Sequence, residues 1–159
     1  MNGAIQPAKF VGGVAEVRIT TIANIDIVEG DITSEASIFR SPLLVETVDI
    51  LEDRSSYSEV EIVEDGVSMV RHSLKIVLRR EAGLRLRSLL STKYIDGVVA
   101  IVGVHASERL LVGYTNKFGV EQPLRVVEGI FETGISPKDY PLYSLTLQCE
   151  DTSYATKFK

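Results

Sequence analysis

The feature that most constrains the fold of this chain is an alternation of apolar and polar residues with a period of two. In residues 71–79 the even positions are apolar or histidine, and the odd positions are polar except for Val77. Residues 15–20 and 144–150 repeat the pattern, as do Val60 and Ile62 between glutamates. Strand side chains point alternately to the two faces of a sheet, so each stretch predicts a strand with one buried face.

Two other segments break this alternation in informative ways. Residues 98–102 form an unbroken apolar, β-branched run, which predicts a strand covered on both faces. A second apolar run at 109–114 follows after a few small or polar residues, so the two runs predict a hairpin. In residues 81–90 Ala82 and three leucines recur at helical spacing, which predicts a helix of about three turns, weakened at Gly83.

These segments together predict a mainly β (α+β) fold, a β-sandwich or barrel with one short helix packed against it. The chain has 159 residues, the size of one ordinary domain, and contains no Pro-rich or Gly/Ser-rich linker. We therefore expect residues 1–159 to form a single domain. Residues 22–56 show the least regular pattern and are consistent with two or three short strands and a long connection.

Composition excludes several classes of function. A net charge of −5 and a pI of about 5.1 argue against a sequence-specific nucleic-acid partner, because such affinity depends on neutralising phosphates. The longest apolar run is far shorter than the roughly 18 residues that a membrane span requires, and the first ten residues do not resemble a signal peptide. We expect a soluble protein without a membrane partner.

The residues that most often carry chemistry are few. One cysteine, Cys149, and two histidines, His72 and His105, are present, and neither histidine has a metal-ligating neighbour at i+2 or i+4. His72 and Cys149 occupy inward positions of their strands, which favours a structural role for both. Because no catalytic or phosphate-binding motif is present, we expect no catalytic, metal or cofactor site.

Charge is distributed unevenly along the chain. Residues 46–65 contain eight acids and one base, whereas residues 71–93 contain seven bases and one acid. One interpretation is an internal ladder of opposite charges across paired strands. The other is a bipolar surface through which one copy contacts the next in a ring or tube. For that interface we predict two sets, the basic Arg79, Arg80, Arg85 and Arg87 and the acidic Glu52, Asp53, Glu59 and Glu61.

The second half of the chain also shows a recognisable order of segments. It runs through a strand at 71–78, the leucines at 86, 89 and 90, the buried run at 98–102, a hairpin returning through 111–114, Thr133 and Gly134, a loop at 136–140, and a final strand at 143–147. This order resembles small structural proteins of tailed phages and prophages of the Bacteroides type. The resemblance implies a non-enzymatic virion protein of the tail, neck or tail tube, assembled with itself and other virion proteins in the host cytoplasm.

Three alternatives remain open from the sequence. A tube protein of a contractile injection or type VI-like secretion system would have similar features. A β-barrel module that holds a small ligand or a peptide in its mouth is a second possibility. An enzyme that uses His72, His105 or Cys149 with nearby acids is a third, and it requires a perturbed histidine or cysteine in a cleft.

Overall fold

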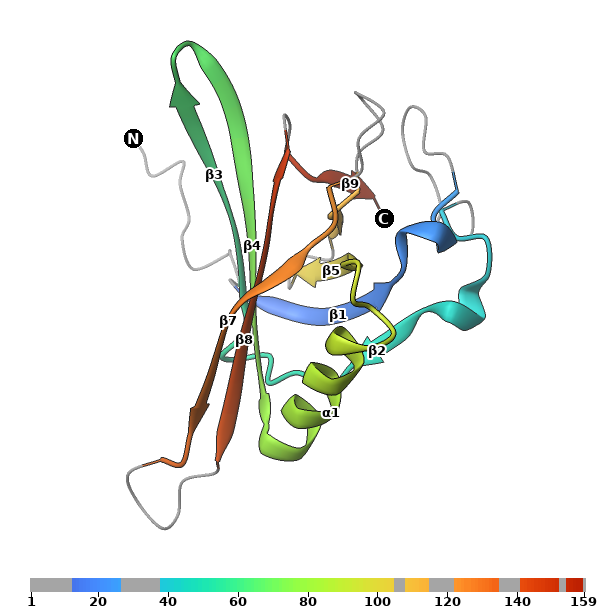
Figure 1. Cartoon of the computed structure of the whole chain (residues 1–159), viewed down its shortest axis with the longest axis vertical. Helices are drawn as coiled ribbons and strands as arrows, with labels where there is room; N and C mark the ends of the chain where they lie inside the picture. The colour runs from blue at the N-terminus through green and yellow to red at the C-terminus, as the bar shows by residue number, and fades with distance from the viewer. Residues whose placement is uncertain are drawn as a thin grey trace, which may run out of the picture.

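A computed structural model describes residues 13–26, 38–104, 108–114, 122–134, 141–151 and 154–158. These residues form two antiparallel sheets with a helix at one end (Figure 1). The five-stranded sheet has the order β2 (Glu46–Val48), β1 (Val14–Thr20), β5 (Val99–Val104), β6 (Arg109–Val112) and β9 (Thr156–Phe158). The four-stranded sheet has the order β3 (Ser56–Glu64), β4 (Val67–Arg79), β8 (Leu142–Asp151) and β7 (Arg125–Glu132).

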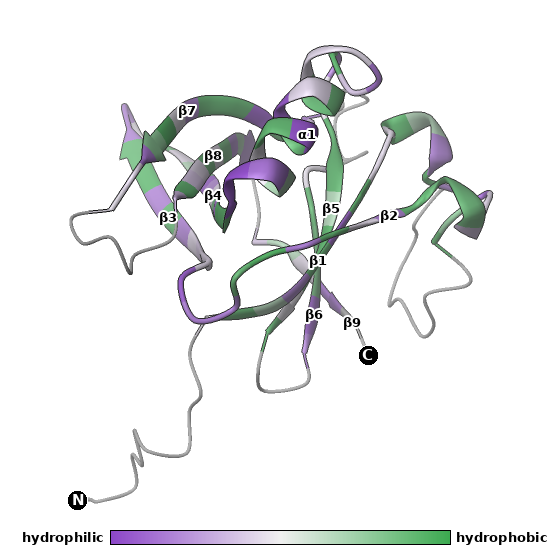
Figure 2. Ribbon diagram, turned by 90° about the horizontal axis from the view of Figure 1, so that it is seen from below, coloured by the Kyte–Doolittle hydropathy of each residue, from purple (hydrophilic) through white to green (hydrophobic). Residues whose placement is uncertain are grey.

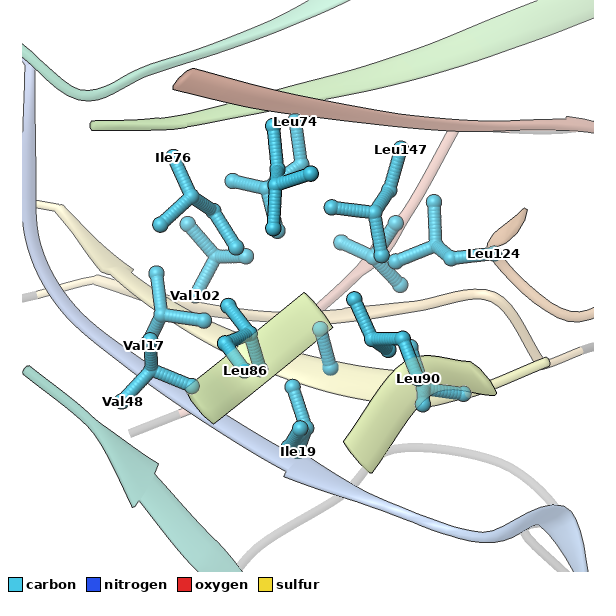
Figure 3. Close-up of a cluster of buried hydrophobic side chains, with 14 of the residues drawn as sticks. Val17, Ile19, Val48, Leu74, Ile76, Leu86, Leu90, Val102, Leu124 and Leu147 are labelled. Carbon is cyan, nitrogen blue, oxygen red and sulfur yellow. The ribbon is translucent and has the colours of Figure 1, made fainter. Parts of the chain in front are cut away.

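The main hydrophobic core fills the space between the two sheets, as Figure 3 shows. Leu74 and Ile76 of β4 and Leu147 of β8 point from one sheet toward Val17 and Val102 of the other. The alternating patterns of β1, β4 and β8 therefore bury one face each, as the sequence predicts. The two sheets with one helix confirm the expected mainly β fold and make it a sandwich.

The outer face of the five-stranded sheet carries a second, smaller core. Val99, Ile101 and Leu111 pack there against Ile25 and Phe39. The two cores lie on opposite faces of β5, so the prediction of a strand covered on both faces is confirmed. Its hairpin partner β6 also forms where the sequence predicts it.

In the described residues between β1 and β3, a buried polar side chain links two segments beside this second core. These residues contain two short 3-10 helices, η2 (Ile22–Asn24) and η4 (Pro42–Leu44), followed by β2. The Asn24 amide donates to the carbonyl of Ser41 and the hydroxyl of Thr20, and its oxygen accepts from the Ser41 N–H. These three hydrogen bonds join residues 22–26 to residues 38–44, which lie on the outer face of the five-stranded sheet.

The helix α1 (Arg80–Ser91) packs against one end of the core and confirms the predicted helix. Leu86 and Leu90 point into the space between the sheets (Figure 3), and hydrophilic residues alternate with apolar ones along it (Figure 2). Gly83 lies against β8. A Cβ added at Gly83 would lie 2.4 Å from the Cβ of Tyr143, so a glycine is what permits this close approach.

The prediction for β3 is only half right. The strand forms, but Val60 is 52% exposed, while Glu59 is half-buried and lies opposite the buried His72. The outer half of the β3–β4 hairpin extends beyond β8, whose pairing with β4 ends at Val70. Figure 1 shows this hairpin projecting past the other strands of its sheet. Val60 lies opposite Arg71, an odd position of β4, so both side chains project from the face of the sheet opposite the core, and the expectation that Val60 faces a core is wrong.

Some sequence predictions lie outside the described residues. These are the environment of His105, the centre of the turn at 106–107 and the loop at 136–140.

Candidate subunit interface

The four predicted basic residues lie at one end of the molecule. Arg79 ends β4 and Arg80 begins α1, and Arg85 and Arg87 lie on the solvent side of the helix. All four are exposed. The Arg80 guanidinium lies 5.2 Å from the centre of the Phe131 ring, and Arg87 donates to the Ser91 hydroxyl at 2.7 Å. The structure thus gathers the basic set around α1, with two of its members held by uncharged groups.

The four predicted acids separate into two pairs. Glu52 and Asp53 are exposed in the turn between β2 and β3. The N–H of Leu51 donates to the carbonyl of Val77 at 2.8 Å, so this turn lies beside the end of β4 that leads into α1. Glu59 and Glu61 lie far along β3, on the projecting hairpin. The structure therefore does not bring the acidic set together, and only the second pair is remote from the basic residues.

Uncharged groups of the chain's own C-terminal part contact the two hairpin acids. The Glu59 carboxylate accepts from the N–H of Ala155, and Glu61 accepts from the hydroxyls of Ser68 and Tyr154. The charge of Glu61 raises the pKa of Tyr154. No lysine or arginine within the described part forms an ion pair with either carboxylate in this arrangement.

The internal charge ladder suggested by the sequence does not form between β3 and β4. Glu59 and Glu61 lie opposite His72 and Val70, on the face that carries the core. Arg71 and Lys75 occupy the odd positions of β4 and therefore project from the opposite face. Arg71 binds Glu150 of β8 instead, at 2.9 Å. Glu46 and Lys93 do form an ion pair between the acidic and basic segments, but at the α1 end.

Distance prevents the hairpin acids from neutralising the basic end. β4 has 13 residues, so Val67 at the hairpin tip and Arg79 at its other end are about 40 Å apart at ~3.3 Å per residue. Glu59 and Glu61 lie opposite His72 and Val70, so the same rise places them about 23 and about 30 Å from Arg79. Exposed charges are screened over about 8 Å at physiological ionic strength. The carboxylates near the tip and the guanidinium groups around α1 are therefore electrostatically independent within one molecule.

A buried polar cluster lies under the middle of the four-stranded sheet. The Tyr57 hydroxyl and His72 Nδ1 are 2.7 Å apart, and His72 lies opposite Cys149 on β8. Burial, followed by the charge of Glu59, raises the pKa of Tyr57. Burial also raises the pKa of the Cys149 thiol to about 12. Since a nucleophilic cysteine needs a lowered pKa, the thiol is not activated, and the cluster has the character of satisfied core polar groups.

Three pockets on the described surface lie around α1 and the start of β7. A pocket of about 330 Å³ lies between the end of α1 and β7, and one of about 350 Å³ between α1 and β2. A third, of about 610 Å³, lies beside η2 and Tyr94. The space between the sheets is filled by fully buried leucine, isoleucine and valine side chains, so these pockets are surface features.

The described residues contain neither a cluster of metal ligands nor a membrane-spanning helix. No three His, Cys, Asp or Glu side chains there are grouped closely enough to hold a metal ion. None of the described helices has the length and apolar character needed to cross a bilayer.

The sequence interpretation missed the tip of the hairpin and one arginine. Glu64 and Asp65 add two carboxylates beyond Glu59 and Glu61, and Asp65-Gly66 forms the two-residue turn between β3 and β4. Asp-Gly between alternating residues is a strong hairpin signal, so this turn was predictable. Arg125 shares the 330 Å³ pocket with Arg87, a proximity that no sequence spacing indicates.

Comparisons with known proteins identify no relative. No protein-family model matches the chain, and neither the curated proteins nor the solved structures contain a significant match.

Proposed function

We propose that this chain is a non-enzymatic structural subunit that assembles with copies of itself into a ring or tube. The observation that carries the proposal is the separation of exposed charge along the four-stranded sheet. Acidic residues lie along the projecting hairpin, about 23 to 40 Å from a basic cluster around α1. A surface that is complementary to a different surface of the same molecule favours head-to-tail contacts, which close into rings or continue as tubes.

The setting that fits such a subunit is the virion of a tailed phage or prophage, in its tail, neck or tail tube. Support comes from the segment order of residues 68–159 and from the sandwich with one flanking helix. In this proposal the protein assembles with other virion proteins in the host cytoplasm. A tube subunit of a contractile injection or type VI-like system has the same physical requirements and is the nearest alternative.

The interface in this proposal joins the basic set of one copy to the acidic residues of the next. Arg85 and Arg87 are central to it because both are exposed on α1, where a neighbour can approach. Glu59 and Glu61 supply carboxylates on the projecting hairpin. Complementary charge of this kind sets register and partner choice more than total affinity.

Charge reversal at α1 tests the proposal. We expect Arg85→Glu with Arg87→Glu to lower the weight-average mass toward the 17.5 kDa monomer at concentrations where the unmodified chain is assembled. Sedimentation velocity measures this, with circular dichroism to verify the fold. Arg40→Glu with Lys75→Glu is the control, because it changes the net charge equally at exposed sites away from the helix. Equal loss of assembly in both pairs would show that net charge, and not this surface, matters.

The ligand-binding alternative makes a different prediction. A module that holds a small molecule or peptide would remain a monomer at every salt concentration. It would show its ligand at one of the surface pockets around α1. A monomer with a bound ligand would therefore replace the assembly proposal.

A further inference from the structure

The free end of the β3–β4 hairpin combines exposed apolar side chains with carboxylates. Val63 is 66% exposed and Val67 is 61% exposed, on either side of the turn. Glu64 and Asp65 lie between them and are also exposed. Val63 lies opposite Ser68 and Val67 opposite Glu64, so the two valines project from opposite faces of the ribbon. A two-stranded ribbon is marginally stable alone in water, and exposed apolar side chains on both of its faces favour a partner that covers it. Exposed valines beside carboxylates at a projecting tip suit a surface that another molecule covers on assembly.

The hairpin presents its tip in a fixed shape. Asp65 has a φ of 51° and Gly66 a φ of 78°, which are the positive values that a two-residue turn of this type needs. Glu64 and Val67 are paired across the turn, and Ser68 donates to Glu61 at 2.7 Å. The tip is therefore preorganised, which reduces the entropy cost of binding.

The 330 Å³ pocket between α1 and β7 has the complementary composition. Its walls include Leu90, Leu124 and Val126, and Ile95 lies at its edge with 69% of its surface exposed. Its only charged residues are Arg87 and Arg125, so it contains no acid. Apolar walls with two guanidinium groups match a ligand that has apolar side chains and carboxylates.

Hydrogen bonds to uncharged groups hold both arginines in place. Arg87 donates to the Ser91 hydroxyl at 2.7 Å, and Arg125 donates to the carbonyl of Asp96 at 3.3 Å. Neither forms an ion pair with a carboxylate of the described residues. Each guanidinium therefore retains its charge and further donors for an incoming carboxylate.

The hairpin cannot fill the pocket of its own molecule. Arg125 is paired with Gln148, which is paired with Ser73 on β4. Ser73 lies six residues from Val67, or about 20 Å along the extended strand. Since the hairpin extends past the other strands of its sheet, at the end of β4 opposite to α1 (Figure 1), a tip that enters this pocket must come from another molecule.

We infer that the tip of the β3–β4 hairpin of one copy inserts into the α1–β7 pocket of a second copy. Val63 and Val67, on opposite faces of the hairpin, contact opposite walls of the pocket, and Glu64 and Asp65 pair with Arg87 and Arg125. The inference rests on the proposed self-assembly and names its contact. Because tip and pocket are different surfaces, each copy donates one hairpin and receives another, which generates a ring or a continuing tube.

Removing the charge or the apolar surface of the tip tests this contact. We expect Glu64→Gln with Asp65→Asn, and separately Val63→Ser with Val67→Ser, to weaken association about tenfold or more in sedimentation equilibrium. Asparagine tolerates the left-handed backbone at position 65, so the turn is retained. Glu108→Gln with Glu128→Gln is the matched control, since it removes two exposed carboxylates outside α1 and the hairpin and should leave association unchanged.

Disulfide trapping gives the direct readout. The chain has one native cysteine, Cys149, which is buried, so introduced cysteines are the reactive ones. Mixing a Glu64→Cys variant with an Arg125→Cys variant should yield a cross-linked dimer under mild oxidation, at a rate well above that of Glu64→Cys mixed with Glu52→Cys.

The outcomes separate the two proposals. Salt-sensitive assembly that survives both tip variants, or cross-linking no faster than the control pair, overturns the tip contact and leaves self-assembly standing. An unmodified chain that remains a monomer at all concentrations overturns both. Assembly lost in the tip variants together with the selective cross-link supports both.

Discussion

Replacement of Gly83 by alanine gives a prediction whose sign depends on the structure. Helix propensity alone favours alanine over an interior glycine by about 1 kcal/mol, so the substitution should stabilise α1. However, the new Cβ would lie 2.4 Å from the Cβ and 2.8 Å from the Cγ of Tyr143. Ordinary carbon contacts are about 3.5–4.0 Å, so the overlap exceeds about 1 Å.

The overlap cannot be relieved by a side-chain rotation. The nearest atom is a Cβ, attached directly to the backbone of β8, so either α1 or the strand must move. Overpacking of this kind costs about 1–3 kcal/mol. We therefore expect Gly83→Ala to lower the free energy of unfolding by about 1–2 kcal/mol, with the overlap outweighing the propensity gain.

Equilibrium urea unfolding followed by circular dichroism measures this effect. The control is Ser88→Ala, an exposed position on the same helix where only propensity acts and a gain of a few tenths of a kcal/mol is expected. A Gly83→Ala variant as stable as the unmodified chain would refute the packing of α1 on β8 described here.

Two further predictions concern the buried polar cluster. Tyr57→Phe removes the hydrogen bond between the Tyr57 hydroxyl and buried His72 and should cost about 1–3 kcal/mol in urea unfolding; an unchanged midpoint would mean that this bond contributes nothing. The folded pKa of Cys149, about 12, lies above its ordinary 9.0, so the protonated thiol is favoured in the fold. The stabilisation from the protonated thiol is complete below pH 9 and is lost as the pH rises toward 12. Cys149→Ala should therefore reduce the decrease of the unfolding free energy between pH 9 and pH 12. The same decrease in the variant and the unmodified chain would refute this.

The strands with one covered face were predictable because their sequence and their surroundings agree. Leu74, Ile76 and Leu147 alternate with polar residues, and a second sheet covers only their side. The same pattern was misleading for β3, where Val60 is exposed and Glu59 faces inward. There the N–H of Ala155, almost a hundred residues away in sequence, supplies a hydrogen bond to the carboxylate. No local pattern encodes that partner.

Other features depended on contacts that have no period. Strand β9 is three residues long, too short for alternation to be recognised. Residues 22–26 and 38–44 are joined by the hydrogen bonds of the Asn24 amide, and in the sequence Asn24 is only an isolated polar residue. The separation of acidic from basic segments is visible in the sequence. The strand pairing, however, determines that Glu59 and Glu61 lie on the hairpin while Glu52 and Asp53 lie in the turn beside the basic end.

The most direct test of self-assembly is the molar mass of the unmodified chain by light scattering, at low and high salt and over a range of concentrations. The charge separation between the hairpin tip and α1 predicts particles well above 17.5 kDa whose mass rises with concentration and falls with added salt. A mass of one chain at every concentration, unaffected by salt, would contradict the proposed assembly.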